Sequence, residues 1–534
     1  MGTPWALDPR AEVLRPLLVG LASAVVLCLP AWLAGGLVGS PGGETLGHAW
    51  VQSWATSAWP AWPVGTDLAA GAASWPVIDP LPTWIVAGSA RVVGLTAAWN
   101  GLVAAGIVVA ALGGARLARA AGGSATFGAL AVPWMPIYLG SLTSGLTEDA
   151  FLGLVAFALA AALEGTWVRA GLLVGLASGC GLYLGWMAAV GVAAVGVRAG
   201  VRGELARSWR GMAAGAAVAA ALSLLAAAPF SGRLGGAAVT RPAPPVHEAH
   251  WALNPWRGAD LASFVAPGEV VLGDAVVREH PTYLGFTTLG LAALGGTPAG
   301  WAAVAACVLV APGEDLAFAG KPLGIRNPAI AVLHVVPFGD RFRNHARLML
   351  LGQLVLVAMA SRGVARLDRW GAGFTASAFT ASAFTASAFT ASAFTASAFT
   401  ASAFTASAVP VVAALVVAGE TAWASPARVP LPVTPSASPA IYASLSTAPP
   451  GLPVRVIGAH NPQQPLYDQR AHGRRLMNGP NQPDPGRPRA EAEIVVAFGE
   501  ATTRLTAELG TPDAVADGAM AWWPGPTGTP ERQP

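Results

Sequence analysis

The sequence predicts an all-α polytopic membrane bundle of about 10–12 transmembrane helices, followed by a small C-terminal domain of mixed helix and strand. Of the 534 residues, 54% are hydrophobic and only 11% are charged, and the mean hydropathy is +0.53. These values are too apolar for a soluble globular chain. Apolar runs recur from residue 14 to residue 370, whereas Pro, Gly and polar residues dominate from residue 425 onward.

The charge pattern favours a lipid bilayer as partner and argues against nucleic acid. The formal net charge is +3 and the pI is near 9.0, but Arg occurs in short clusters between apolar runs. That pattern is typical of membrane topology signals and not of a phosphate-binding face. The cysteines Cys28, Cys180 and Cys307 lie inside hydrophobic runs without metal-ligand spacing, so we expect small apolar core residues.

The apolar runs predict the spans in order. Residues 14–38 are long enough to cross a bilayer; a cleaved signal peptide is the alternative, because the sequence at 34–36 resembles a cleavage site. A helix beside the membrane is expected at 81–93, and further spans at 95–112, 125–142, 149–163, 168–181, 182–197, 211–230, 282–296, 298–312 and 346–360. Several are shorter than the roughly 20 residues of a straight span, so we expect them to tilt or to pack inside the bundle.

The Arg distribution tests this layout, because short Arg-rich loops collect on the cytoplasmic side. With these spans, one side carries the Arg-containing segments at 10–15, 116–119, 169, 198–210 and 362–369. A membrane domain is therefore expected over residues 1–370, with exoplasmic loops at 39–95 and 231–281. The segments at 144–148 and 312–344 fall on the same exoplasmic side.

The remainder of the chain divides into a repeat, a last span and a soluble domain. Residues 371–408 are a low-complexity segment built from perfect Phe-Thr-Ala-Ser-Ala copies, either a cytoplasmic linker or a helix whose last copies lengthen the following span. The last transmembrane helix is expected at 409–424. Residues 425–534 are expected to form an exoplasmic α+β domain with strands at 454–457 and 493–498, a helix at 502–509 and a disordered end.

The opening loop carries the first candidates for chemistry. Glu44 follows a Pro-Gly-Gly turn beside the bilayer and is either a catalytic base or an ordinary solvated carboxylate. His48 lies four residues on and shares a face with Glu44 if the segment is helical, although this spacing equally suits a structural hydrogen bond. Asp79 precedes a proline and is interpreted first as a helix N-cap, with a second catalytic carboxylate as the alternative.

Aromatic and metal signals in the loop are weaker. Trp50 is expected in an interfacial aromatic belt, or stacked on a sugar or lipid as the alternative. The loop has no Asp-Asp or Asp-X-Asp pair. No metal ligand is therefore assigned and no cofactor is expected; a divalent metal is compatible with the loop but is not implied.

A cationic cluster precedes the span at 346–360 and consists of Arg341, Arg343, His345 and Arg347. Guanidinium groups bind phosphate oxygens bidentately at a water-poor interface, so the cluster is a candidate for a carrier phosphate; anchoring of lipid headgroups is the alternative. Glu148 and Asp149 lie on the same predicted side, either as first-turn carboxylates of a helix or facing the same cavity as Glu44.

Short motifs in a particular order give the chain a family resemblance. They are Gly43-Glu44-Thr-Leu-Gly-His48-Ala-Trp50, Trp75-Pro-Val-Ile-Asp79-Pro80, Ser178-Gly-Cys-Gly-Leu-Tyr183, Asn254-Pro-Trp-Arg-Gly-Ala-Asp260, Tyr283-Leu-Gly, Pro337-Phe-Gly-Asp-Arg341-Phe-Arg343-Asn-His-Ala-Arg347 and Tyr467-Asp-Gln-Arg-Ala-His472. In this order the motifs resemble the GT-C-type polytopic membrane glycosyltransferases, in particular a bacterial branch of that family. The similarity covers most of the chain except the repeats.

The resemblance implies transfer of a sugar from a polyprenyl-phosphate carrier to a glycan, lipid or protein acceptor, at the exoplasmic face of the bacterial inner membrane. It implies an acidic base in the first exoplasmic loop, where this chain has Glu44 at a position that is more often Asp. The catalytic residues expected on this basis are Glu44, Asp79 and His48. The expected substrate-binding residues are Arg341, Arg343, Arg347, His345 and Trp50.

A second class of function stays open at this stage. A non-catalytic integral membrane protein, either a transporter or a cell-envelope assembly scaffold, could keep the same architecture. A transporter is expected to place ionisable residues near the centre of broken spans. The predicted span interiors are almost free of charge and the polar groups collect on one side, which favours chemistry at a surface over translocation.

Overall fold

The structure is a computed structural model that describes residues 9–62, 77–228, 258–265, 282–319, 321–336, 339, 344–370, 409–424, 429–457, 464–472, 474, 476 and 493–523. The Phe-Thr-Ala-Ser-Ala repeats, most of the loop at 231–281, the end after Trp523, and both Arg341 and Arg343 lie outside these ranges. The predictions made for them therefore stay predictions.

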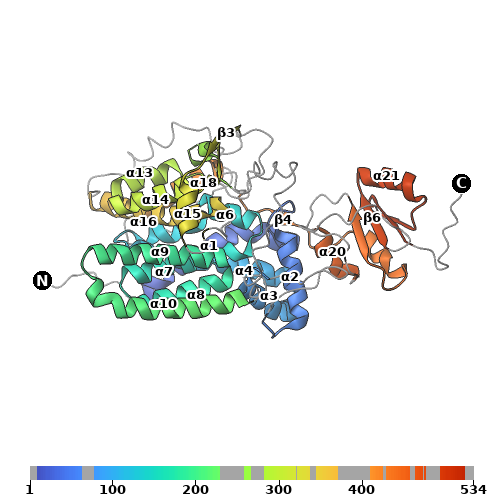
Figure 1. Ribbon diagram of the computed structural model, residues 1–534, viewed down its shortest axis with the longest axis horizontal. Coiled ribbons are helices and arrows are strands. Elements are labelled where there is room, and N and C mark those ends of the chain that lie inside the picture. Colours follow the sequence, from blue (N-terminus) through green and yellow to red (C-terminus); the bar gives the residue numbers. More distant parts are fainter. Residues whose placement is uncertain are drawn as a thin grey trace.

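Long apolar helices form the body of the protein (Figure 1). In the part of the chain that the structure describes, five helices are long and apolar enough to cross a membrane. They lie within α1 (Pro9–Ala34), α4 (Leu95–Ala120), α9 (Leu182–Val201), α10 (Leu205–Ala227) and α16 with the turn before it (Leu348–Trp370). The predicted class, a helical membrane bundle, is confirmed.

Shorter helices complete the bundle. They are α7 (Gly153–Leu163), α8 (Trp167–Cys180), α13 (Phe286–Gly295), α14 (Pro298–Val310) and α18 (Val409–Ala424). Each lies where a short apolar run predicted a span. Because these helices fall below the length of a straight span, the total of about 10–12 transmembrane helices stays a prediction.

The segment predicted as one span at 125–142 is broken in the structure. It consists of α5 (Ala125–Ala131), the short η1 (Val132–Trp134) and α6 (Pro136–Thr143), and the two halves are bent by 40°. Pro133 and Pro136 cause the break, because proline lacks the backbone N–H of a helix interior and its ring clashes with the preceding turn.

Glycines allow the helices of the bundle to approach closely. A Cβ added at Gly113 of α4 would collide with the backbone of Gly153 in α7, and one added at Gly171 of α8 would collide with the carbonyl of Gly215 in α10. Membrane helices lack a hydrophobic driving force between them and associate through such close van der Waals contact. The small residues of these runs therefore determine which helices are neighbours.

The segments predicted to be exoplasmic meet at one end of the bundle. There β1 (Leu37–Val38) pairs antiparallel with β4 (Val433–Thr434), and the helices α2 (Thr45–Ala58) and α3 (Pro80–Val93) lie between the bundle and the C-terminal domain (Figure 1). At the other end, Ser124 N donates to Ser361 O. The assignment of these two ends to the exoplasmic and cytoplasmic sides stays a prediction.

A small β-hairpin lies between α14 and α16. Its strands are β2 (Asp315–Phe318) and β3 (Lys321–Arg326), which pair antiparallel, and the short helix α15 (Ala329–Val335) follows it. The turn η5 (Leu261–Phe264) packs beside β2. This hairpin was not predicted from the sequence.

The C-terminal domain contains a four-stranded sheet in the order β5-β6-β8-β7. Its elements are α19 (Ile441–Ser444), η11 (Leu445–Thr447), β5 (Val454–Ile457), α20 (Gln464–His472), β6 (Ile494–Phe498), α21 (Glu500–Leu509), β7 (Ala514–Ala516) and β8 (Ala519–Trp522). The two predicted strands pair in parallel as β5 and β6, and the predicted helix is α21. The hairpin β7–β8 was missed, although its Asp517-Gly518 turn, with positive φ at both residues, is a strong hairpin signal.

Candidate active site

The start of α2 is fixed against the turn that precedes α7. Glu44 occupies the N-cap position of α2, and its backbone N–H donates to Ser144 O at 2.7 Å. Gly43 and Gly145 have no room for a side chain at this contact, since an added Cβ would collide with Ser144 and Thr45 respectively. The glycines of the opening loop therefore let two distant segments touch beside the Glu44 carboxylate.

Asp79 occupies the predicted N-cap position of α3, but its side chain makes no capping hydrogen bond. Its carboxylate accepts hydrogen bonds from Thr83 Oγ1 at 3.0 Å and from Thr147 Oγ1 instead. The preferred interpretation of this side chain as a cap is therefore wrong. Its carboxylate points toward His48, because the two hydroxyls and the imidazole offer it stronger partners than the free N–H groups of α3.

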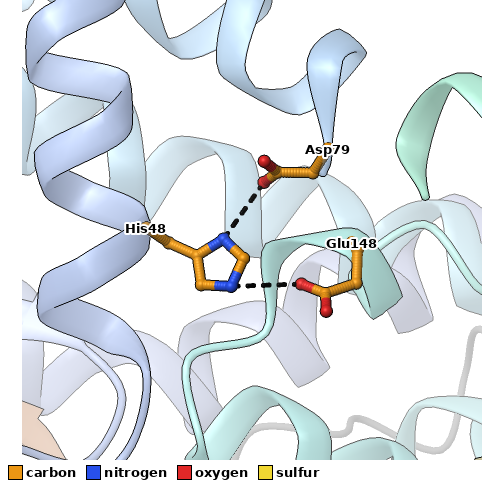
Figure 2. Close-up of side chains that lie close together, drawn as sticks. All are labelled: His48, Asp79 and Glu148. Atoms are coloured by element: carbon orange, nitrogen blue, oxygen red, sulfur yellow. Dashed lines mark hydrogen bonds and ion pairs between the residues drawn. The ribbon is translucent and has the colours of Figure 1, made fainter. Parts of the chain in front are cut away.

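His48 is the centre of the cluster (Figure 2). Its Nδ1 lies 3.3 Å from Asp79 Oδ2, and its Nε2 lies 3.3 Å from Glu148 Oε2. Its Nε2 also lies 3.5 Å from Glu44 Oε2, which confirms the helical i,i+4 spacing expected from the sequence. One buried imidazole thus contacts three carboxylates from three different segments of the chain.

The carboxylates determine the protonation of His48. Burial alone would lower the pKa of His48, but the charges of Glu148 and Asp79 and the hydrogen bonds to Asp79 and Glu44 raise that pKa well above its ordinary value. We therefore treat His48 as an imidazolium at neutral pH, with both ring nitrogens donating.

The imidazolium in turn acts on Glu44. Burial alone would raise the pKa of the Glu44 carboxyl, but the hydrogen bond and charge of His48, with the charge of Arg347, hold this pKa below its ordinary value. For Glu148 the balance is the opposite, because burial raises its pKa more than Arg347 and His48 lower it. The two carboxyls beside one ring thus differ in basicity.

Arg347 joins the cluster from the start of α16, within the 3-10 turn η8 (His345–Arg347). Its Nη1 donates to Glu148 Oε1 at 2.9 Å, and its Nε lies 3.9 Å from Asp149 Oδ2. Asp149 also accepts from Ser141 Oγ at 2.9 Å. The guanidinium lies over the ring of Tyr183, 5.5 Å from its centroid. Arg347, a member of the predicted cationic cluster, therefore pairs with Glu148. Glu148 in turn contacts His48, which contacts Glu44 and Asp79 of the opening loop.

Buried polar atoms remain without hydrogen-bond partners in the described part of the cluster. They include Glu148 Oε2, Asp149 Oδ1 and Arg347 Nε, although Glu148 Oε2 lies 3.3 Å from His48 Nε2 as an ion pair. An unpaired buried donor or acceptor costs about 1–3 kcal/mol, so natural proteins keep such groups where a ligand or water completes them. A ligand or a water molecule could therefore form additional hydrogen bonds with the cluster next to Glu148.

His48, Asp79 and Glu148 can each offer one ligand atom to a metal ion, and these atoms lie within 4.8 Å of one another. In Figure 2, however, the ring stands between the two carboxylates, with one nitrogen facing each of them. A metal ion could take only one of these nitrogens. The arrangement fits an imidazolium that itself supplies the positive charge between the carboxylates.

The structure also describes Trp50 and His345, two further residues predicted for the site. Trp50 is buried in the apolar core of the C-terminal domain, and its indole N–H donates to Gln469 Oε1 at 3.0 Å. His345 is buried in η8, two residues before Arg347. The roles predicted for Trp50 and His345 in substrate binding stay predictions.

Thr147 and Glu148 belong to the cluster but were not selected as site residues from the sequence. Thr147 Oγ1 lies 3.0 Å from His48 Nδ1 and donates to Asp79. Glu148 lies in the first turn of η2, as one interpretation had it, and its Oε2 contacts the same imidazole nitrogen, His48 Nε2, as Glu44. The signal was a Thr-Glu-Asp triplet at the predicted exoplasmic side of an otherwise apolar stretch.

Neither a protein-family model nor a curated protein matches the sequence. Among solved structures, the chain is similar to ArnT from Cupriavidus metallidurans bound to undecaprenyl phosphate, with a TM-score of 0.47 and 16% identity over 96% of this chain and 97% of that one. It is also similar to the oligosaccharyltransferase AglB from Archaeoglobus fulgidus, with a TM-score of 0.46 and 11% identity over 92% of this chain and 69% of that one.

A third similar structure is the arabinofuranosyltransferase AftD from Mycobacteria, with a TM-score of 0.46 and 14% identity over 92% of this chain but only 35% of that one. Two of the three proteins are named as sugar transferases, the class to which the sequence resemblance pointed. Because all three TM-scores lie below 0.5, the activity of this chain has to be argued from its own residues.

Proposed function

We propose that this protein is a membrane glycosyltransferase that moves a sugar from a polyprenyl-phosphate-linked donor to an acceptor hydroxyl, with Glu44 as the base. One observation carries the proposal: Glu44 is the carboxylate of the cluster that solvent reaches, with a side chain 37% exposed, whereas His48, Asp79 and Glu148 are buried. An acceptor arriving from outside would meet this carboxylate first.

The chemistry needs a base that is ionised and fixed in position. His48 keeps Glu44 ionised at neutral pH and binds one of its oxygens, which leaves the other oxygen for the acceptor hydroxyl. The acceptor oxygen forms a bond to the anomeric carbon, and the bond from that carbon to the phosphate oxygen breaks. The hydroxyl proton passes to Glu44, and polyprenyl phosphate leaves with the bonding electron pair.

The leaving phosphate needs positive charge near it. The Nε–H of Arg347 is buried and makes no hydrogen bond among the described residues, while Nη1 is held by Glu148. We propose that this Nε–H donates to a phosphate oxygen when the donor is bound. Arg341 and Arg343 precede this residue closely in the sequence and are proposed to contribute as well. Asp79 and Glu148 keep His48 charged and oriented, so we propose that they position the base indirectly.

The proposal keeps the expected division of the chain. Residues 1–370 and 409–424 form the membrane domain, and residues 425–534 form an exoplasmic domain that covers the opening loop. The repeat at 371–408 lies between these two parts of the membrane domain in the sequence. We place the protein in the bacterial inner membrane, with the acid cluster at the exoplasmic surface.

The test compares wild type with Glu44→Gln in proteoliposomes supplied with polyprenyl-phosphate sugars. The amide retains the size of the side chain but cannot accept the proton, so transfer should fall by about 10²–10⁴-fold. Glu164→Gln is the matched control, because Glu164 pairs with Arg116 in an ion pair of α4 and the end of α7, far along the bundle from the cluster. The control should retain the wild-type rate.

Two results would contradict the proposal. Equal transfer by wild type and Glu44→Gln would remove Glu44 as the base. No transfer by either protein, with every sugar donor supplied, would favour the non-catalytic scaffold.

A further inference from the structure

The β2–β3 hairpin and α15 expose large apolar side chains. On the hairpin, Phe318 is 54% exposed and Ile325 is 55% exposed, and Leu323 is also exposed. On α15, Val335 is 83% exposed. A two-stranded hairpin is at best marginally stable in water, and a contiguous apolar patch on a protein surface marks a contact with something apolar.

The hairpin is held firmly in this exposed position. Asp260 Oδ1 accepts a hydrogen bond from Ala319 N at 2.9 Å, directly at the turn between the strands. At the other end, Asn327 N donates to Glu314 O at 2.7 Å, and Asn327 Nδ2 donates to Leu309 O at 2.7 Å. The apolar side chains thus project from an anchored base.

The hairpin leaves the bundle at the same end as the acid cluster. An added Cβ at Gly300, near the start of α14, would contact Met359 in the middle of α16, and one at Gly352, near the start of α16, would contact Cys307 near the end of α14. The two helices are therefore antiparallel, so the end of α14 lies beside the start of α16. Leu309, in the last turn of α14, is 61% exposed, and its carbonyl accepts from Asn327 Nδ2 directly after β3, so a further exposed apolar residue lies beside the base of the hairpin.

The layer that suits this element is the boundary between hydrocarbon and water. Hydrocarbon offers no hydrogen-bonding partner to the N–H and C=O groups at the edges of a two-stranded sheet. Water would leave the apolar side chains of the hairpin exposed to solvent. The headgroup layer supplies hydrogen-bonding partners and an apolar side together. Lys321, exposed at the turn, adds a cation that can reach lipid phosphates.

We propose that the hairpin β2–β3 and α15 form an interfacial lipid anchor. Phe318, Leu323 and Ile325 insert among the upper acyl-chain carbons of the leaflet that faces the acid cluster, and Lys321 binds phospholipid phosphate. The anchor fixes the depth of the start of α16 in the bilayer. This proposal does not depend on the glycosyltransferase activity.

The test uses single-cysteine variants in a background in which Cys28, Cys180 and Cys307 are replaced by Ala. Phe318→Cys reports on the hairpin, and Val515→Cys is the matched control, because Val515 is an exposed apolar residue of the strand β7 in the C-terminal domain. Both are reconstituted in phosphatidylcholine vesicles containing phosphatidylglycerol and treated with a charged thiol reagent. The hairpin cysteine should react about tenfold more slowly, since the remaining apolar side chains hold it in the bilayer.

A second measurement identifies what covers the hairpin. A fluorophore on the cysteine at position 318 should be quenched by lipids carrying bromine near the glycerol, and one at position 515 should not. In vesicles without phosphatidylglycerol the quenching should fall, and Lys321→Ser should remove this dependence on anionic lipid. Equal reaction at both positions would overturn the proposal. Protection at 318 without quenching by lipid would overturn it too, because a protein partner would then cover the face.

Discussion

At the scale of single residues, the acid cluster works through the positive charge of His48. A buried carboxylate is costly unless a partner compensates it, and one imidazolium here compensates three acids at distances of 3.3, 3.3 and 3.5 Å. Arg347 supplies the second cation, against Glu148 and Asp149. The state of each group therefore depends on the others, and His48 and Arg347 together hold the pKa of the partly exposed Glu44 below its ordinary value.

Replacing His48 with Gln should change the pH dependence of sugar transfer. Glu44 acts as a base only when ionised, so activity is retained down to its pKa and lost below it. Wild-type Glu44 has a pKa below its ordinary value because of His48 and Arg347. With Gln at position 48, burial and the neighbouring acids would raise that pKa, and the acidic limb of the rate profile should move to higher pH.

The measurement is the rate of transfer against pH for wild type, His48→Gln and Glu164→Gln. The control carries a neutral replacement far from the cluster and should follow the wild-type profile. A His48→Gln profile that is lower at every pH but has an unmoved acidic limb would mean that His48 does not tune Glu44.

At the scale of secondary-structure elements, the close packing of α4 on α7 fixes the acid cluster. The turn Thr147–Asp149 directly precedes α7, so a shift of α7 would move Glu148 away from His48 and Arg347. The contact depends on glycines: Gly113 meets Gly153, and Gly106 meets Ala150 O. Close-packed interiors transmit such shifts because there is no free space to absorb them.

Gly113→Ala and Gly101→Ala make a matched pair within α4. The first methyl group would meet the Gly153 backbone, which should cost about 1–3 kcal/mol, lower the melting temperature in detergent and reduce transfer. The second methyl group meets nothing within 4 Å and should raise stability by up to about 1 kcal/mol, because Ala favours a helix over Gly. Equal melting temperatures for the two variants would show that the α4–α7 contact can relax.

Most elements of the bundle could be predicted because hydropathy alone places an apolar helix in a membrane. The predicted start at residue 95 is the observed start of α4, and the predicted helix at 81–93 differs from α3 by one residue. The break at Pro133 and Pro136 was missed because the apolar run continues through it. The β2–β3 hairpin was missed because its side chains show no alternation of apolar and polar residues.

The candidate site was only partly predictable for a related reason. Glu44 and His48 could be paired from their spacing, since four residues make one helical turn. Nothing local in the sequence pairs His48 with Glu148, which is 100 residues away and approaches only when α4, α7 and the opening loop pack together. The interpretation of Asp79 as a helix cap was wrong because the sequence preference for Asp at a helix start carries no information about distant partners such as Thr147.

At the scale of the whole molecule, α2 connects the acid cluster with the C-terminal domain. One face of α2 presents His48 to the bundle, while Trp50 is buried among the core residues of the C-terminal domain and bonds Gln469 of α20. The pairing of β1 with β4 adds a second connection, reinforced by Thr434 Oγ1, which donates to Gly39 O at 2.8 Å. The last part of the chain thus holds the loop that carries the proposed base.

Trp50→Ala should release the C-terminal domain from α2. Loss of a buried Trp costs about 3–5 kcal/mol, so backbone amide exchange in α20 should accelerate strongly, and transfer should fall because the opening loop loses its support. Trp50→Phe keeps most of the packing and loses one hydrogen bond worth about 1 kcal/mol, so it should have an intermediate effect. Trp209→Ala, at an exposed position of α10, is the control and should leave exchange in α20 unchanged.

The same experiment separates this structural role from the substrate contact expected of Trp50 from the sequence. If Trp50 supports the domain, amide exchange in α20 should accelerate and sugar transfer should fall in the same variants. Both effects should be larger in Trp50→Ala than in Trp50→Phe. If Trp50 stacks on the donor instead, Trp50→Ala should raise the KM for the lipid-linked sugar while exchange in α20 stays at the wild-type rate. That second outcome would contradict the coupling through α2, because the domain would then remain docked without the indole.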